Sequence, residues 1–442
     1  MRIQVVTEGS GSAITALASW RLLTWSLVLC PVVVSMTSPR VFTAPHLLDL
    51  LGGSSYEAQR AFSSQVYRLV MLYLALLGGG LTVVWRRQLA LVALRSPLFL
   101  AGSGLAVSLL ASAAFGTRPL FAPGLVVWPL LFAALAAIPP IDAEALLGLL
   151  RRKLRILVVL SALSAAVLPD WGLETDYRQS YIAGWDWRLH GVLPHANSLG
   201  PICALLILLE LQQGGRWRWL LAAFTTAVLL ATQSKTSLAA VAVAAPLLLA
   251  AQGLGALRAR FDVRMTLLIL GWSLALLATM MAMLWPWVAA RADDLMAERG
   301  REIRSLTGRT ELWRITVDSW RGNPWFGDGP GLWDQEMVDR NVSILDWMPG
   351  HAHSQTMQAL GQSGFAGLAA WFGYLLVLAW MCWRAPPGRA ALGWGLLLVM
   401  IIDSLSEPWF SRDLPPQFPL LLYVHLAFTT QTMPHLNSET EL

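Results

Sequence analysis

The sequence predicts an all-α integral membrane protein with about twelve transmembrane helices, and three observations support this fold class. Of the 442 residues, 56% are hydrophobic and only 13% are charged, whereas soluble domains carry about 25% charged residues. The mean hydropathy is +0.55. Apolar runs, several of them near the roughly 20 residues that a bilayer requires, recur along the whole chain.

The positions of the apolar runs divide the chain into three parts. The runs lie near 13–36, 67–85, 97–115, 123–139, 154–168, 195–212, 217–233, 236–252, 265–288, 354–383, 390–404 and 415–431. We expect residues 1–288 to form a bundle of about nine transmembrane helices that includes a loop over 169–194. Residues 289–353 are expected to form a large loop domain with short amphipathic helices, and residues 354–442 to add about three transmembrane helices.

Basic residues between the runs predict the orientation of the chain. They occupy alternate loops, namely Arg86, Arg87 and Arg95, then Arg151, Arg152, Lys153 and Arg155, then Arg216 and Arg218, then Arg258, Arg260 and Arg264, and finally Arg384 and Arg389. Loops rich in Lys and Arg face the cytoplasm, so both termini are expected inside. The loops 169–194 and 289–353 then face the periplasm of a bacterial inner membrane. This topology accounts for the net charge of +5, and we expect membrane lipids, not nucleic acid, as partners.

In the large loop, a short amphipathic helix is expected after Gly308-Arg309-Thr310. Trp313, Thr316, Val317 and Trp320 follow at the spacing i, i+3, i+4 and i+7. One mostly apolar face of this kind rests on a helix bundle or on the membrane surface. Gly322-Asn323-Pro324 is expected to end the helix.

The large loop ends at His351-Ala352-His353-Ser354, directly before the tenth apolar run. A histidine at a helix start just outside the membrane can titrate near neutral pH and act as a general base, or it can be purely structural. A His-x-His pair also suggests metal, but neither a cysteine, a third histidine nor an acidic cluster lies nearby in the sequence. Two ligands do not make a site, so we expect no metal.

The smaller loop holds aromatic and cationic candidates for substrate binding. Trp185 and Trp187 can stack on sugar rings or anchor the loop at the membrane interface. Arg188 offers a guanidinium fork that suits phosphate oxygens, and His195 and Asn197 open the next apolar run. Lys235 lies between the seventh and eighth runs, where it either snorkels to the interface or meets an anionic substrate group inside the bundle.

These motifs resemble the O-antigen ligase family, which forms a superfamily with O-antigen polymerases and bacterial protein O-oligosaccharyltransferases. His353-Ser354, nine residues and then Gly364-Phe365-Ala366-Gly367 fits the pattern H-[NSQ]-x9-G-x-x-[GTY]. Further matching elements are Arg188-x-x-Gly191, His195-Ala196-Asn197, Ser234-Lys235-Thr236, Gly308-Arg309 and Pro324-Trp325-Phe326-Gly327-Asp328-Gly329. The family commonly has Arg where Lys235 stands, so this position keeps its charge and loses bidentate geometry.

The resemblance implies a GT-C-like glycosyltransferase that needs neither nucleotide, metal nor other cofactor. Such an enzyme transfers a polysaccharide from undecaprenyl pyrophosphate to a sugar hydroxyl of lipid A–core at the periplasmic face, with inversion. His353 is the candidate general base, and Arg188 and Arg309 are the candidate cations for the departing pyrophosphate. Lys235, His195, Asn197, Trp185, Trp187 and His351 are the candidate substrate-binding residues.

Two kinds of alternative remain open from the sequence. A polysaccharide polymerase and a protein O-oligosaccharyltransferase share the donor chemistry and differ in acceptor. A flippase or transporter of lipid-linked sugars belongs to another class and requires ionisable residues within the spans. Asp403 and Glu407 are its main acidic candidates, and both lie near the outer end of the eleventh run.

Overall fold

The computed structural model describes residues 96–258, 309–337 and 350–428, with shorter gaps inside these ranges. The runs near 13–36, 67–85 and 265–288 lie outside the described residues, as do most of 123–139 and 415–431. Within the described part, three helices are long and apolar enough to cross a membrane, in Pro97–Phe115, Lys235–Gly253 and Gln355–Arg384, and three shorter helices are also apolar. A mostly helical membrane protein is confirmed, whereas the expected total of about twelve spans and the GT-C-like architecture stay predictions.

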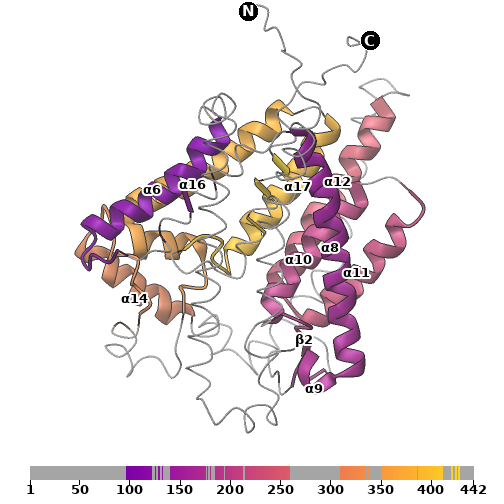
Figure 1. The fold of residues 1–442 in the computed structure, drawn as a ribbon, viewed down its shortest axis with the longest axis horizontal. Coiled ribbons are helices and arrows are strands. Elements are labelled where there is room, and N and C mark those ends of the chain that lie inside the picture. The colour runs from indigo at the N-terminus through magenta and orange to yellow at the C-terminus, as the bar shows by residue number, and fades with distance from the viewer. Residues whose placement is uncertain are drawn as a thin grey trace, which may run out of the picture.

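Eleven elements are described along the chain (Figure 1). They are α6 (Pro97–Phe115), α8 (Pro140–Val167), α9 (Pro169–Gly172), β1 (Leu173–Glu174), β2 (Arg188–Leu189), α10 (Ala196–Gln212), α11 (Arg218–Thr232), α12 (Lys235–Arg258), α14 (Arg309–Gly322), α16 (Gln355–Arg384) and α17 (Pro387–Ser404). The two short strands pair antiparallel, with Glu174 opposite Arg188.

Helix α10 lies at the centre of the packed bundle. It contacts α8, α11, α12 and α17, while α17 also packs against α12 and α16, and α16 packs against α6 and α14. Figure 1 shows α6, α14 and α16 on one side and α8, α10 and α11 on the other. Nearly all residues of α10 are buried, as expected for a helix that is apolar around its whole circumference.

Helix α8 corrects the expected boundary of the fifth apolar run. It begins at Pro140, so the basic residues 151–155 lie inside a helix and not in a loop. Arg155 donates from Nε and Nη2 to the two carboxylate oxygens of Glu210 in α10, at 2.7 Å each. Glu210 is 1% exposed, and this bidentate partner compensates a charge that would otherwise be costly to bury.

Several helices begin or end on one side of the bundle, which we call the site end. Helices α8, α11 and α17 end there, and α10, α12 and α16 begin there. Hydrogen bonds join the segments between them. Gln233 Nε2 donates to the Trp187 carbonyl at 2.6 Å, and Ser406 Oγ to Thr236 Oγ1 at 2.9 Å. Side chains distant in sequence therefore meet at the site end.

Helix α14 confirms the expected amphipathic helix and shows which surface it rests on. It packs against α16 in the bundle. Its buried residues are Leu312, Ile315 and Thr316, whereas Trp313, Val317 and Trp320 are only partly buried. The expected apolar face is therefore wrong in detail, because Leu312 and Ile315 point into the interface and the tryptophans flank it.

Helix α16 is broken at Gly364, where φ is 60° and ψ is −149°. The turn that follows α14 docks into the break, with the backbone N–H of Phe365 donating to the Pro324 carbonyl at 2.9 Å and that of Ala366 to Trp325 at 3.1 Å. A Cβ at Gly364 would lie 2.5 Å from the Pro324 oxygen. The backbone conformation and this close approach both require glycine.

Candidate functional site

The turn 351–354 precedes α16 and holds the candidate base. Ser354 is the N-cap residue of α16, and its hydroxyl accepts from the Met357 N–H at 3.5 Å. His353 has a φ of 47°, a left-handed conformation that costs a residue with a Cβ about 1–2 kcal/mol. Strain of this kind is concentrated at functional sites in proteins.

Two neighbouring elements fix the backbone of the turn at Ala352. The Gln358 side-chain oxygen, from α16, accepts from the Ala352 N–H at 2.8 Å. Trp313 of α14 donates from Nε1 to the Ala352 carbonyl at 3.1 Å. Both polar backbone groups of this fully buried residue are therefore satisfied, and the histidines on either side of it are held in place.

Glu407, just beyond α17, faces both histidines of the turn. It is 5% exposed. Its Oε1 accepts from Asn197 Nδ2 at 2.8 Å and lies 3.6 Å from His353 Nδ1, while its Oε2 lies 3.8 Å from His351 Nε2. The sequence offered Glu407 only as a transporter candidate, because no local motif connects it to a histidine on another segment.

The electrostatics of this cluster favour an ionised carboxylate beside a neutral His351. Burial raises the pKa of Glu407, but the polar contact with His353, the neighbouring histidine charges and the Asn197 amide outweigh it and bring the pKa to about 2. For His351, burial lowers the pKa to about 4, and the attraction of Glu407 only partly offsets this. Near pH 7 the carboxylate is therefore charged and His351 is neutral.

The same three residues also have to be weighed as a metal site. His351, His353 and Glu407 each place a potential ligand atom within 4.8 Å of the others. However, His351 Nδ1 accepts from the His353 backbone N–H at 3.2 Å. That bond places the ring proton of neutral His351 on Nε2, the nitrogen that faces Glu407, which leaves no lone pair there for a metal. The cluster thus fits hydrogen bonding to a carboxylate better than metal coordination.

Arg188 is buried and engaged by a residue that the sequence did not suggest. Its Nε and Nη2 donate to Glu174 at 2.8 and 3.0 Å, and Nη2 also lies 2.8 Å from His195 Nε2. Its guanidinium carbon lies 4.3 Å above the Tyr177 ring. The fork expected to bind phosphate therefore already holds a carboxylate, supplied across the β1–β2 pair.

Gly191 explains the spacing of the Arg188-x-x-Gly191 element. Its φ is 62°, and a Cβ there would lie 2.1 Å from the Ser161 Cβ. Glycine at this position lets the chain leave β2 in close contact with α8, which places Arg188 next to His195.

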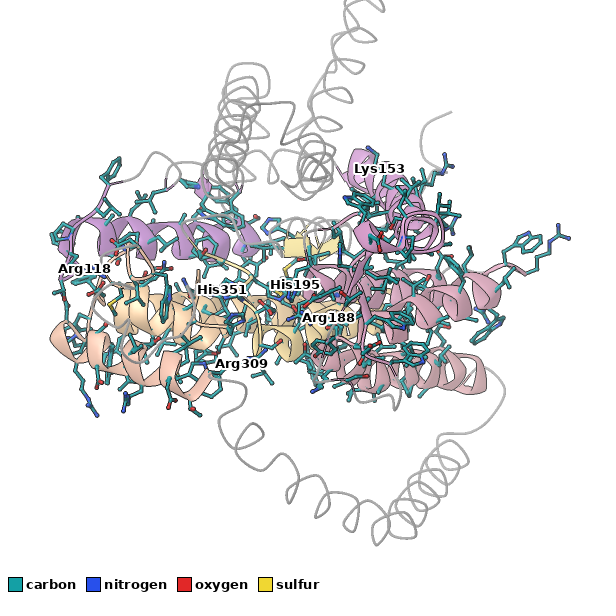
Figure 2. The ribbon with its side chains drawn as sticks, turned by 90° about the horizontal axis from the view of Figure 1, so that it is seen from below. Arg118, Lys153, Arg188, His195, Arg309 and His351 are labelled. Carbon is teal, nitrogen blue, oxygen red and sulfur yellow. The ribbon has the colours of Figure 1, made fainter. Side chains whose placement is uncertain are left out.

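His195 and Arg309 complete the cationic surroundings of the histidine turn. Both lie close enough to His351 to lower its pKa electrostatically. Arg309 is the first residue of α14. Figure 2 shows Arg188, His195, Arg309 and His351 near the middle of the molecule, with Arg118 and Lys153 toward its edges. The structure thus brings together candidates from segments far apart in the sequence.

Three other candidates lie at the margin of this cluster. Lys235 is exposed at the first residue of α12, so its side chain is not turned into the bundle. Trp185 and Trp187 stack on each other with ring centroids 4.5 Å apart and are partly exposed. They adjoin Arg188 in sequence and present aromatic surface beside it.

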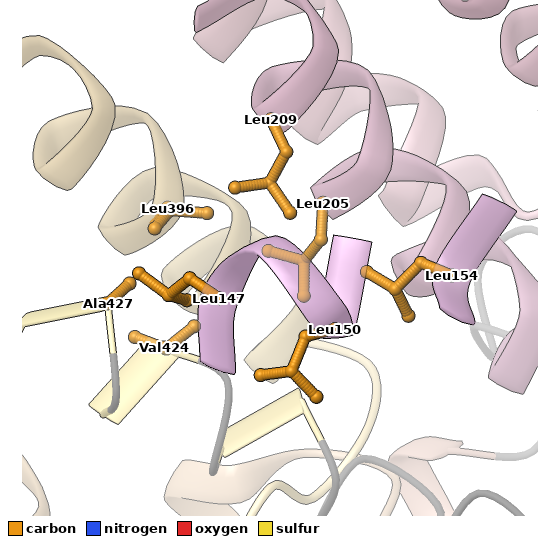
Figure 3. Close-up of a pocket in the computed structure, with 8 residues that line it drawn as sticks. All are labelled: Leu147, Leu150, Leu154, Leu205, Leu209, Leu396, Val424 and Ala427. Atoms are coloured by element: carbon orange, nitrogen blue, oxygen red, sulfur yellow. The ribbon is translucent and has the colours of Figure 1, made fainter. Parts of the chain in front are cut away.

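A small apolar cavity lies elsewhere, between α8, α10, α17 and residues 424–427 (Figure 3). It is lined by Leu147, Leu150, Leu154, Leu205, Leu209, Leu396, Val424 and Ala427. These side chains offer neither a charge nor a nucleophile, so the polar cluster at the site end is the candidate active site.

A comparison with family models identifies residues 220–372 as O-antigen ligase. This match confirms, over these residues, the resemblance drawn from the motifs of the chain. The matched segment includes Lys235, Arg309, His351 and His353, whereas Arg188 precedes it. A search among curated proteins found no match to the chain.

Proposed function

We propose that this protein is a member of the O-antigen ligase family and transfers a finished polysaccharide from undecaprenyl pyrophosphate to a sugar hydroxyl of lipid A–core. The reaction takes place at the periplasmic face of the inner membrane, in lipopolysaccharide biosynthesis. The observation that carries the proposal is the position of His353 beside the buried carboxylate of Glu407, in a cluster that includes His195 and Arg309.

His353 acts as the general base. Its Nδ1 proton is directed at Glu407, and its Nε2 takes the proton of the acceptor hydroxyl. The hydroxyl oxygen forms a bond to the anomeric carbon, and the bond from that carbon to the pyrophosphate oxygen breaks with inversion. The leaving pyrophosphate takes the electron pair. A placed base contributes about 10²- to 10⁴-fold to the rate, and the carboxylate stabilises the imidazolium as it forms.

Fixed cations stabilise the departing pyrophosphate. Arg309 lies close to the histidine turn, and Arg188 reaches the cluster through His195. Charge-assisted hydrogen bonds from guanidinium to phosphate oxygens are strong and directional, and preorganised cations stabilise developing charge. Lys235 supports them from the rim, so the chemistry proceeds without a metal or another cofactor.

The aromatic side chains beside Arg188 bind the sugar. Trp185 and Trp187 present stacked, partly exposed rings, and aromatic faces pair well with the apolar faces of sugar rings. His195 and His351, which lie beside Arg188 and Glu407, complete the proposed substrate-binding set.

A transfer assay with purified protein, lipid-linked O-glycan and lipid A–core tests the proposal. We expect wild type to build glycan onto lipid A–core in the presence of EDTA, and His353→Ala and Arg309→Ala to lose this activity. Arg321→Ala is the matched control for Arg309→Ala, because Arg321 lies in the same helix but is exposed and paired with Asp318. Thermal melting verifies that each variant is folded.

The product identifies the acceptor class. Longer lipid-linked chains would assign the protein to the polymerases, and glycan on serine or threonine of a protein would assign it to the O-oligosaccharyltransferases. Transfer that survives His353→Ala would discard the proposed base, and transfer blocked by EDTA would discard metal independence.

A further inference from the structure

A four-residue motif occurs twice in the chain, once at the start of α10 and once directly before α16. His195-Ala196-Asn197-Ser198 opens α10, and His351-Ala352-His353-Ser354 opens α16. Three of the four positions are identical. Both alanines are 0% exposed, and both serines are buried.

The two motifs share one hydrogen bond as well as their sequence, although Asn197 is helical within α10 and His353 has a φ of 47° before α16. In the first, His195 Nδ1 accepts from the Asn197 backbone N–H at 3.1 Å. In the second, His351 Nδ1 accepts from the His353 backbone N–H at 3.2 Å. The first histidine of each motif therefore closes a ring onto the residue two positions later.

The third side chains of both turns meet at one atom. Asn197 Nδ2 donates to Glu407 Oε1 at 2.8 Å, and His353 Nδ1 lies 3.6 Å from the same oxygen. Glu407 thus lies between the motifs 195–198 and 351–354, of which the first supplies an amide and the second an imidazole.

We infer that Asn197 is a positioning residue for the catalytic base, acting through Glu407, and that the 195–198 turn is the second arm of a clamp around this carboxylate. The inference rests on the proposed role of His353. The amide fixes the Glu407 rotamer, so that Oε1 stays aligned with His353. Asn197 then has no need to touch the substrate, which separates it from the sugar-binding role expected from the sequence.

Several charged and titratable groups surround Glu407 and the histidine turn, and they influence the pH dependence of the reaction. The groups facing Glu407 and the histidine turn are His351 and His353 from the turn, His195 from the start of α10, Arg309 from α14, and Asp403 from the last turn of α17. Asn197 offers this carboxylate a neutral amide donor. Removing the amide lets Oε1 move out of line with His353, which weakens the carboxylate as a partner for the imidazolium, so the acid limb of the rate profile should move to lower pH.

The test compares Asn197→Leu with Asn197→His in the full-length protein in detergent, using the transfer assay. Asn197→Leu is similar in volume and lacks the donor. We expect kcat to fall about 10-fold or more, the KM for both substrates to stay within about 3-fold, and the acid limb to move to lower pH. Asn197→His turns the first motif into a copy of the second, restores an N–H donor, and should recover kcat at neutral pH to within about 3-fold of wild type.

Gln212→Leu is the control for the loss of an amide from α10. Gln212 accepts from Gln252 at 3.2 Å at the other end of the helix, so its loss should leave the pH profile unchanged. A folded Asn197→Leu with wild-type kcat and pH profile would overturn the inference, as would a change confined to KM. If Asn197→Leu does not fold, Asn197→His is the test of the inference. A folded Asn197→His whose kcat is reduced 10-fold or more overturns it. The proposed function fails separately, if His353→Ala remains active.

Discussion

Replacing Glu407 with glutamine isolates the contribution of its charge. Glutamine keeps the length of the side chain and an oxygen that can accept from Asn197, but it removes the negative charge. The pKa of Glu407 is lowered to about 2, so the carboxylate is already ionised above about pH 4.5 in both the folded and the unfolded protein. The variant and wild type therefore differ in charge at every pH of a transfer assay.

The structure gives the size of the expected effect. Glu407 Oε1 lies 3.6 Å from His353 Nδ1. Two unit charges about 4 Å apart interact by about 4 kcal/mol at an effective dielectric constant of about 20. If roughly half of the proton charge has reached His353 in the transition state, the carboxylate lowers the barrier by about 2 kcal/mol, or about 30-fold in kcat.

Initial rates at saturating donor and varied acceptor measure this effect. We expect kcat to fall about 30-fold and KM to change by less than about 3-fold, because the interaction strengthens only as the proton moves. The acid limb of the profile should move to lower pH, since the imidazolium loses its counter-charge. Asp318→Asn is the control for the loss of a carboxylate, because Asp318 is exposed on α14 and pairs with Arg321. A folded Glu407→Gln with wild-type kcat would refute the assignment of Glu407 as the partner of the base.

Three further substitutions test other parts of the molecule. Glu174→Gln frees the guanidinium that Glu174 occupies, so the KM for the lipid-linked donor should fall about 3- to 10-fold; a rise would show that Glu174 aligns the arginine instead. Arg155→Leu leaves Glu210 charged and buried, which should lower the free energy of unfolding by about 3–5 kcal/mol in thermal melts, with the double variant Arg155→Leu/Glu210→Leu recovering most of the loss. Gly364→Ala should lower both melting temperature and activity, because its Cβ meets backbone at 2.5 Å, whereas Gly373→Ala, with open space around its Cβ, should change neither.

The sequence predicted the helices that carry a strong local signal. The run near 354–383 corresponds to α16, and the amphipathic spacing after Arg309 corresponds to α14. Helix α8 was misjudged because a cluster of basic residues normally marks a loop, and the partner that makes Arg155 tolerable in a helix comes from α10. A charge compensated across helices leaves no trace in the local sequence.

The candidate site likewise contains residues that the sequence identified and residues that it missed. His353 and Arg188 lie in recognisable motifs, and both reach the cluster. Glu407 and Glu174 lie in no motif, since each acts through a contact with a distant segment. Lys235 has the expected charge, but its direction depends on how α12 begins, and it is exposed. Motif spacing thus identifies residues that belong to a local sequence pattern. It misses residues that reach the site only through contacts between distant segments.

The spacing between His353 and Gly364 has a physical meaning in this fold. Helix α14 and the first part of α16 lie against each other. They are joined near their starts by the bond from Trp313 to Ala352, and at their ends by the docking of the Pro324 turn into the break at Gly364. The joined residues are 11 positions apart in the first segment, from 313 to 324, and 13 apart in the second, from 352 to 365.

Because the two mostly helical segments lie against each other and are joined at both ends, they brace each other. A single added residue in either segment would turn everything beyond it by about 100° and break one of the two joints. The fixed spacing therefore maintains the position of the base, because the break at Gly364 determines where the histidine turn meets Trp313, and so where His353 meets Glu407.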